Sequence, residues 1–224
     1  MNASTGAWTY NATATAKGRD LFKVQVTDGN STVSLEYTLI INTPALFGQD
    51  SYSFNTNQNT NYTGSVLATD ADGDSLTYSV VSQGSKGTVT VDPLTGRYQY
   101  APAEGQAGND TFIIGVSDGN FTSEVRVNVH IESDISIASG TLTLSVAQND
   151  IVTGNVNASD ADGDILTYSI SQQGDKGNAN VMGDGSFSYY AKSGAGDDSF
   201  VIKITDGIHT SYVTVYVHIS TNPY

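Results

Sequence analysis

The sequence predicts an all-β protein built from tandem β-sandwich domains, and three observations support this prediction. A run of three aspartates at alternate positions, residues 70–74, recurs unchanged at residues 160–164. Apolar and polar residues alternate with a period of two, and no stretch shows sustained helical spacing. Gly, Asn, Asp and Ser separate the alternating segments, as tight turns require. The chain is therefore expected to be an array of similar β units.

The repeats define the expected domains. Residues 46–133 align with residues 135–221 when two single-residue gaps are allowed. Near the start of the chain, Trp8 and Tyr10 correspond to Tyr98 and Tyr100. An isolated half repeat cannot bury its core face alone, so we expect a neighbour or another chain to order it. The predicted domains are the C-terminal half of a truncated repeat at 1–43 and two complete repeats at 44–133 and 134–224.

Each complete repeat is expected to fold as a sandwich. In its last strand, alternating Val and Ile place one face on a core and turn Asn128 and His130 outward. About seven short strands in a unit of this length are typical of a β-sandwich. In the 44–133 repeat the predicted strands lie near 51–55, 62–68, 75–82, 87–92, 96–101, 110–117 and 123–132.

Composition limits the possible partners. With 23 acidic against 9 basic residues the net charge is −14, which argues against nucleic acid as a partner. An acidic chain can serve as a sink for divalent cations, or can simply be soluble. There are no cysteines, so disulfides cannot support these small domains, and bound metal is one alternative. No signal peptide or membrane insertion is expected in this segment, and any targeting information is expected to lie outside it.

The acidic run is the strongest candidate site. Three carboxylates within one short loop, from Asp70, Asp72 and Asp74, repel one another unless a cation lies among them. Calcium takes about six to eight oxygen ligands, mostly carboxylates, carbonyls and water, and Gly73 allows the loop to curl around it. We therefore predict calcium sites at this loop and at its second copy, formed by Asp160, Asp162 and Asp164.

The loop differs from other calcium motifs. Its glycine precedes the third aspartate, no glutamate closes it, and the flanking segments are strands, so it is not an EF-hand. The sequence also lacks the glycine-rich nonapeptide run of a calcium-binding β-roll. The predicted site is thus a loop between strands.

Ligands from other segments are also expected. Asp118, in the loop before the last strand, is the best candidate for a distant ligand, and Asp206 and Asp28 are its counterparts. Asp-Gly pairs are common turn formers, however, so Asp118 with Gly119 is also compatible with a simple turn.

The junctions between repeats are expected to differ in their ligands. Asp50, just after the first linker, can add an oxygen, whereas the next repeat has Gly140 at that position. The second site is therefore expected to bind calcium more weakly, or to use a ligand from its own junction. Glu132 and Asp134 are the candidates for that ligand.

Taken in order, several segments resemble the bacterial cadherin-like, or VCBS-type, tandem repeat of large surface adhesins. The resemblance implies immunoglobulin-like or cadherin-like Greek-key sandwiches in series, calcium near the junctions, and export to the bacterial cell surface. It also implies a stalk or adhesive role in biofilm or host attachment. The expected partners are calcium and neighbouring repeats, with surface glycans or other adhesin chains as further candidates. The segments that carry the resemblance are 49–52, 64–74, 87–91, 96–100, 108–112 and 116–119.

Two other functional classes were weighed. An enzyme is not expected, because no nucleophile elbow is present and the clustered aspartates suit a metal better than a glycosidase cleft. A calcium-dependent carbohydrate-binding module is the main alternative, since 13 tyrosines and Trp8 could stack on sugars. The aromatic residues recur as strand pairs, however, such as Tyr98 with Tyr100 and Phe187 with Tyr189, which favours core packing.

Overall fold

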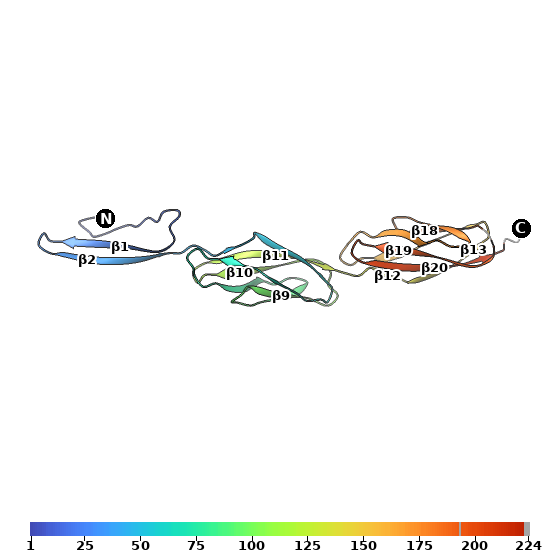
Figure 1. The fold of residues 1–224 in the computed structure, drawn as a ribbon, viewed down its shortest axis with the longest axis horizontal. Coiled ribbons are helices and arrows are strands. Elements are labelled where there is room, and N and C mark those ends of the chain that lie inside the picture. Colours follow the sequence, from blue (N-terminus) through green and yellow to red (C-terminus); the bar gives the residue numbers. More distant parts are fainter. Residues whose placement is uncertain (193, 222–224) are drawn as a thin grey trace. The chain divides into compact units, whose positions relative to one another are not determined.

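The computed structural model describes residues 1–192 and 194–221, and every regular element in that part of the chain is a β-strand (Figure 1). The all-β prediction is therefore confirmed. The chain forms two compact units. The first comprises Met1–Phe54, Asn59–Glu104 and Asp110–Val129, and the second comprises Asn55–Gln58, Gly105–Asn109 and His130–Tyr224. These units cut across strands, so the domain boundaries after residues 43 and 133 stay predictions.

The first unit begins with a hairpin of two long strands, β1 (Gly18–Thr27) and β2 (Thr32–Ile41). They pair antiparallel in continuous register from Gly18 opposite Ile41 to Thr27 opposite Thr32. The turn is closed by Asp28, whose Oδ1 accepts the backbone N–H groups of Asn30 and Ser31. Among the described residues these two strands form a sheet of their own, which leaves Leu21, Val26, Val33 and Leu35 exposed.

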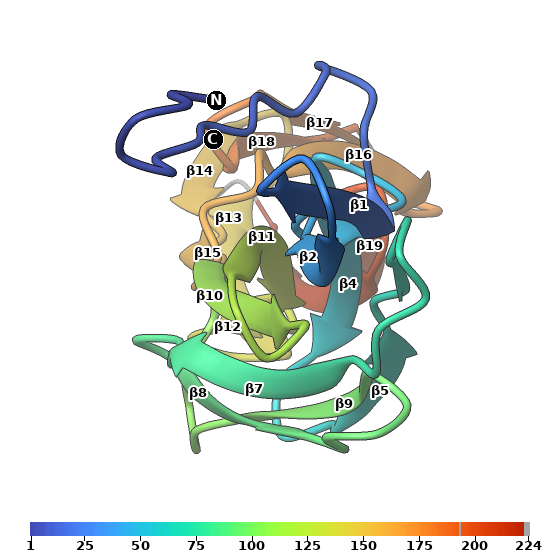
Figure 2. The same ribbon diagram turned by 90° about the vertical axis from the view of Figure 1, so that its left-hand side faces the viewer.

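The next repeat, from β3 to β11, forms the strands of a sandwich. One sheet has the order β4-β11-β10-β7, and another has the order β5-β9-β8. Figure 2 shows β5 and β9 side by side, in agreement with their antiparallel pairing. The strands are β3 (Leu46–Phe47), β4 (Ser51–Asn57), β5 (Tyr62–Ser65), β6 (Ala68–Thr69), β7 (Thr77–Ser82), β8 (Gly87–Val91), β9 (Arg97–Pro102), β10 (Gly108–Ser117) and β11 (Thr122–Glu132).

Each predicted strand is present, with one difference. The segment predicted as a single strand over 62–68 forms β5 and β6, which pair with different partners, β9 and β3. Val66, between the two strands, is fully buried, whereas Leu67 is exposed. The chain therefore leaves one small sheet and joins another at this point, and it enters the acidic loop directly after β6.

The core of the first unit is aromatic at its centre. Phe112 on β10 stacks on Tyr100, with ring centroids 5.8 Å apart, and contacts Tyr98 edge-on at 5.4 Å. All three rings are buried, which confirms that the strand-paired aromatic residues of this repeat are core residues. Val125 and Val127 on β11 are buried as well, while Asn128 is exposed, as the alternation predicted.

The second unit contains the same arrangement. Its main sheet has the order β13-β20-β19-β16, in which β13 and β20 run parallel. The buried residues of β20 (Val213, Val215, Val217 and Ile219) lie in one hydrophobic core with Phe187, Tyr189 and Phe200. The strands are β12 (Ser136–Ile137), β13 (Thr141–Ala147), β14 (Ile151–Asn155), β15 (Ala158–Ser159), β16 (Thr167–Gln172), β17 (Gly177–Val181), β18 (Ser186–Ala191), β19 (Gly196–Thr205) and β20 (Thr210–Ser220).

An aspartate bonded to a buried tyrosine ties the two layers together in each complete repeat. Asp110 is 8% exposed, and its carboxylate accepts the hydroxyl of Tyr100 at 2.6 Å and the backbone N–H groups of Ser85 and Lys86. Burial opposes the charge, but these hydrogen bonds outweigh it and lower the pKa of Asp110. Asp198 has the same role with Tyr189 in the second unit. These aspartates are structural and lie outside the predicted metal sites.

Candidate metal centres

The first acidic loop curls as predicted. Asp70 organises it, because its Oδ1 accepts the backbone N–H groups of Asp72 at 2.8 Å and Asp74 at 3.1 Å. Gly73 has a positive φ of 82°, a conformation that glycine adopts without strain. One carboxylate oxygen from each of the three aspartates lies within 4.8 Å of the others. The structure therefore brings Asp70, Asp72 and Asp74 together.

The linker residue Thr43 is bound to this loop. Its backbone N–H donates to Asp72 Oδ2 at 2.6 Å, and its hydroxyl donates to the same oxygen. These bonds from Thr43 lower the pKa of Asp72. Partial burial and the charges of Asp70 and Asp72 raise the pKa of Asp74. The charged form is therefore favoured at Asp72 and disfavoured at Asp74. A bound cation would stabilise the charged form of both carboxylates.

Asn42 adds a neutral oxygen to the first loop. Its Nδ2 donates to Asp118 Oδ2 at 2.9 Å, while its Oδ1 is buried and has no hydrogen-bond partner among the described residues. Asp70 Oδ2 and Asp72 Oδ1 are likewise buried without a partner in that part of the chain. Buried polar oxygens without partners are costly. Two of these oxygens belong to the acidic loop, and the third belongs to the residue before Thr43, which binds that loop. Oxygens of this kind suit a hard cation.

Asp118 and Asp50 lie outside the group of carboxylates. Both oxygens of Asp118 are used, since Oδ1 accepts the backbone N–H groups of Asn120 and Phe121 at 2.7 Å each and Oδ2 accepts Asn42. Asp118 is therefore placed to orient the amide of Asn42, and its charge also contributes to the raised pKa of Asp74. Asp50 is exposed and is not among the grouped carboxylates.

The second acidic loop repeats this backbone geometry. Asp160 Oδ1 accepts the backbone N–H groups of Asp162 at 3.0 Å and Asp164 at 3.4 Å, and Asp160 Oδ2 is buried without a partner among the described residues. The linker residue Ser133 donates its backbone N–H to Asp162 Oδ2 at 2.6 Å. Burial opposes the charge of Asp162, yet hydrogen bonds within the loop and from Ser133 lower its pKa.

The ligand groups around the second loop are different. Oxygens of Asp162 and Asp164 gather with Glu132 and His130, with one ligand atom from each residue within 4.8 Å of the others. Glu132 was predicted as a junction ligand, and the structure places it at this loop. His130 lies on the outward side of β11, between the buried Val129 and Ile131, but its side chain is only 25% exposed and its Nε2 lies 3.7 Å from Glu132 Oε2. His218, at the same position of the last strand, is 62% exposed, as predicted.

Asp206 and Asp134 are not in this group. Asp206 Oδ1 accepts the backbone N–H groups of Ile208 and His209, and its Oδ2 lies 3.4 Å from His209 Nδ1. Burial opposes its charge, but these bonds lower the pKa of Asp206. Asp134 is 94% exposed and lies 3.6 Å from His209 Nε2. Asp206 therefore closes a turn and contacts a histidine rather than the acidic loop.

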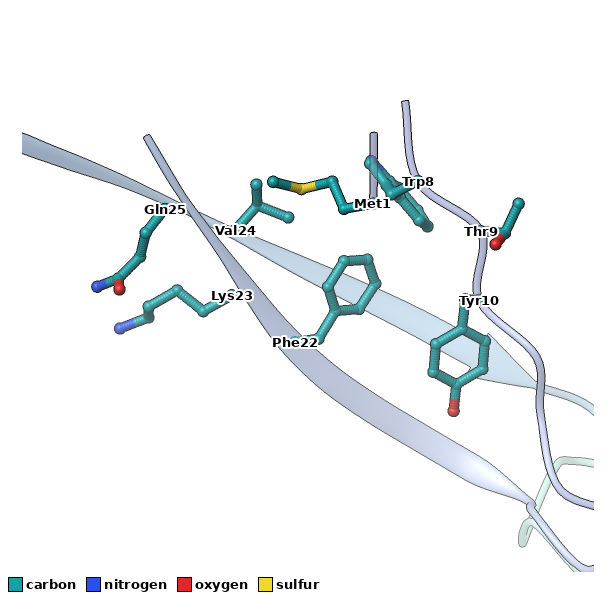
Figure 3. A pocket seen from close by; sticks show the side chains of 8 residues that line it. All are labelled: Met1, Trp8, Thr9, Tyr10, Phe22, Lys23, Val24 and Gln25. Atoms are coloured by element: carbon teal, nitrogen blue, oxygen red, sulfur yellow. The ribbon is translucent and has the colours of Figure 1, made fainter. Parts of the chain in front are cut away.

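An aromatic pocket lies against the hairpin of the first unit (Figure 3). Trp8 and Tyr10 project toward Phe22 of β1, with ring centroids 4.7 and 6.0 Å from Phe22. Trp8 also lies 5.0 Å from Tyr37. Trp8 and Tyr10 are partly exposed, unlike the buried pairs of the two complete repeats. The pocket is lined by Met1, Trp8, Thr9, Tyr10, Phe22, Lys23, Val24 and Gln25.

The sandwich strands and their acidic loops define a class, the immunoglobulin-like tandem domain with a cadherin-like arrangement. The sequence profile described as "Bacterial Ig domain" matches residues 42–130 and 133–218. The chain belongs to this family, in two consecutive copies. Bacterial Ig domains are typical of extracellular and surface proteins. The search of curated proteins found no match.

Solved structures support the fold. The titin fragment I67–I69 is similar at TM-score 0.55 and 8% identity, over 90% of this chain and 75% of that one. Protocadherin gammaB7 EC3-6 is similar at TM-score 0.51 and 17% identity, over 90% of this chain and 60% of that one. Human Protocadherin-24 EC1-2 gives TM-score 0.50 and 18% identity, over 81% of this chain and 100% of that one. The chain spans only 35% of an endo-fucoidan hydrolase that it also matches, at TM-score 0.37.

Sequence reasoning missed Asn42 and His130. The offset of 90 residues could have found Asn42, because Asn42 precedes the first acidic loop by the same distance as Glu132 precedes the second. His130 could have been found from its place two residues before Glu132 on the same strand. No helix in the described part of the chain meets the length and hydropathy needed to cross a bilayer.

Proposed function

We propose that this chain is a calcium-binding segment of a large bacterial surface adhesin, in which bound calcium stiffens the array of domains. The observation that carries the proposal is the set of three buried, unpartnered oxygens at the first loop, from Asn42, Asp70 and Asp72. Buried neutral and charged oxygens that lack a hydrogen-bond donor suit calcium, which prefers oxygen ligands.

The stiffening follows from where the ligands come from. Thr43 and Ser133 belong to the predicted linkers, and each is hydrogen-bonded to an aspartate of the loop that follows it in sequence. An ion bound by that loop and by the residue before the linker threonine or serine would hold the linker in one conformation. Binding to the folded state alone also adds stability. With a Kd of about 10⁻⁴ to 10⁻³ M, typical of extracellular modules, about 10 mM calcium adds about 1.4–2.7 kcal/mol per site.

Asp74→Asn tests the calcium site with two opposite effects. Loss of hydration and repulsion from neighbouring carboxylates raise the pKa of Asp74, so removal of its charge should raise the melting temperature of the chain in chelator. The same change removes a ligand and should weaken calcium binding measured by titration calorimetry. Glu104→Gln, which removes an exposed charge outside both groups, serves as the matched control. The proposal would be contradicted if calcium left the melting temperature of the wild-type chain unchanged. It would also be contradicted if Asp74→Asn bound calcium as tightly as the wild type.

We also propose that this segment is not catalytic and that it lies on the cell surface or outside the cell. The second candidate function is a calcium-dependent carbohydrate-binding module. The observation that favours it is the partly exposed pocket formed around Trp8, Tyr10 and Phe22 (Figure 3). A glycan array separates the two: calcium-dependent binding of a defined sugar that is lost in Trp8→Ala would support the carbohydrate-binding module.

A further inference from the structure

The second loop carries an inference that goes beyond calcium binding. We propose that His130, Glu132, Asp162 and Asp164 form a binding site for a divalent transition-metal ion of the zinc class. One ligand atom from each of the four residues lies within 4.8 Å of the others. The group thus offers one imidazole nitrogen and three carboxylates, a donor set that zinc accepts.

Glu132 supplies the first independent observation. Its side chain is 5% exposed, and its Oε1 accepts Asn55 Nδ2 at 2.8 Å. Its other oxygen, Oε2, is buried and has no hydrogen-bond partner in the described part of the chain. Oε2 lies 3.7 Å from His130 Nε2, within the group. A buried carboxylate oxygen without a donor is costly, and a metal ion at this position would satisfy it.

The imidazole of His130 is oriented for metal binding. Its Nδ1 lies 2.9 Å from Asn109 Oδ1. Because that oxygen only accepts hydrogen bonds, Nδ1 carries the proton, and in the neutral ring Nε2 holds the free lone pair. This is the arrangement of metal-ligating histidines, whose second nitrogen donates to an oxygen that fixes the ring. Nε2 and Glu132 Oε2 are then two acceptors that face each other, and a cation between them removes the conflict.

The donor set separates this site from the first one. At the first loop, Ile40 and Asn42 hold the positions of His130 and Glu132, 90 residues earlier in the chain, so no imidazole is available there. Calcium takes oxygen ligands, whereas imidazole nitrogen suits zinc, copper and nickel. The two loops share a backbone geometry and a sequence, yet the residues that precede them select different ions.

The test uses the full chain with Zn²⁺ or Ca²⁺ as the sole added metal, measured by titration calorimetry and by the ¹⁵N chemical shifts of the histidine rings. We expect Zn²⁺ to bind and to shift His130 Nε2. His130→Ala should weaken Zn²⁺ binding at least about tenfold, the change that corresponds to about 1.4 kcal/mol. His218→Ala is the matched control, since His218 has the same strand position and an Asp197 partner but belongs to neither group of metal-ligating side chains among the described residues. His209→Ala controls for the imidazole that contacts Asp206 and Asp134.

The outcomes separate this inference from the calcium proposal. Equal loss of Zn²⁺ binding in His130→Ala and in either control would overturn it. So would a second loop that binds only Ca²⁺, or a His130 ring that titrates without any response to Zn²⁺. Asp74→Asn should leave Zn²⁺ binding unchanged, because Asp74 belongs to the other group. If the wild-type chain binds Zn²⁺ but its melting temperature does not change with calcium, the proposed function is contradicted and the zinc site is not.

Discussion

The two acidic loops have the same five-residue sequence, and in each the first aspartate accepts the backbone N–H groups of the other two. Different residues, however, lie beside the two loops. The first faces the amide of Asn42, held by Asp118. The second faces the carboxylate of Glu132 and the imidazole of His130, held by Asn55 and Asn109. A motif therefore fixes the shape of a loop, whereas the chemistry of the site depends on residues about 30 positions away in the sequence.

The two complete repeats are expected to have equivalent scaffolds. Asp110 and Asp198, each bonded to a buried tyrosine, test this expectation with the largest effect. Asp110→Asn and Asp198→Asn should each lower the free energy of unfolding by about 3 kcal/mol, because each leaves buried donors poorly satisfied. Chemical denaturation, monitored for each unit, measures the loss. Asp92→Asn, in an exposed turn, is the control. Clearly unequal losses for Asp110 and Asp198 would show that the scaffolds differ.

Acid should destabilise both repeats in the same way, by a smaller amount. The folded-state pKa values of Asp110 and Asp198 are lowered from 3.8, so the unfolded state binds the proton first as the pH falls. The stability from these carboxylates is present above about pH 3.8 and is lost as the pH falls through their lowered folded-state pKa values. The free energy of unfolding, measured by chemical denaturation at several pH values from about 5 to about 2, should show this loss, because carboxyl groups titrate in this range. The double variant Asp110→Asn with Asp198→Asn should show a flatter profile, and an unchanged slope would contradict the assignment.

If the first loop is given the neighbouring residues of the second, it should also acquire the second loop's preference for zinc. Arg19, Ile40 and Asn42 precede the first loop as Asn109, His130 and Glu132 precede the second. Arg19 and Ile40 face each other across the β1–β2 hairpin, so Asn at 19 can orient His at 40. The combined change Arg19→Asn, Ile40→His and Asn42→Glu should raise Zn²⁺ affinity of the first loop about tenfold, or about 1.4 kcal/mol. Titration calorimetry in a His130→Ala background isolates that loop. No gain would show that the loops differ by more than these three residues.

The smallest expected effect concerns Asp50. This residue was predicted as a ligand that distinguishes the first site from the second, but its side chain is exposed and outside the carboxylate group. We expect Asp50→Ala to change calcium affinity by less than about twofold, since exposed charges at a distance are screened by salt. Asp72→Ala, at the centre of the group, is the positive comparison. A loss for Asp50→Ala as large as that for Asp72→Ala would restore Asp50 as a ligand.

The sequence by itself determined the all-β fold, the repeats, most of the strands and the curled acidic loops. These features depend on local spacing: alternate burial in β11 and β20, and a glycine at 73 and 163 between closely spaced aspartates. The alternation could not show that the segment 62–68 changes sheets, because Val66 and Leu67 are both apolar and only packing separates them.

Only the tertiary structure decided which other groups reach the loops. Asp118 and Asp206 were predicted from the sequence as distant metal ligands, with a simple turn as the alternative. In the structure each closes a turn, and Asp118 also accepts Asn42 while Asp206 lies beside His209. His130 alternates outward along its strand, yet it lies beside Glu132 and the second loop, because the end of β11 and that loop meet in one unit. Such proximity arises from packing between distant segments, which periodicity along the chain does not encode.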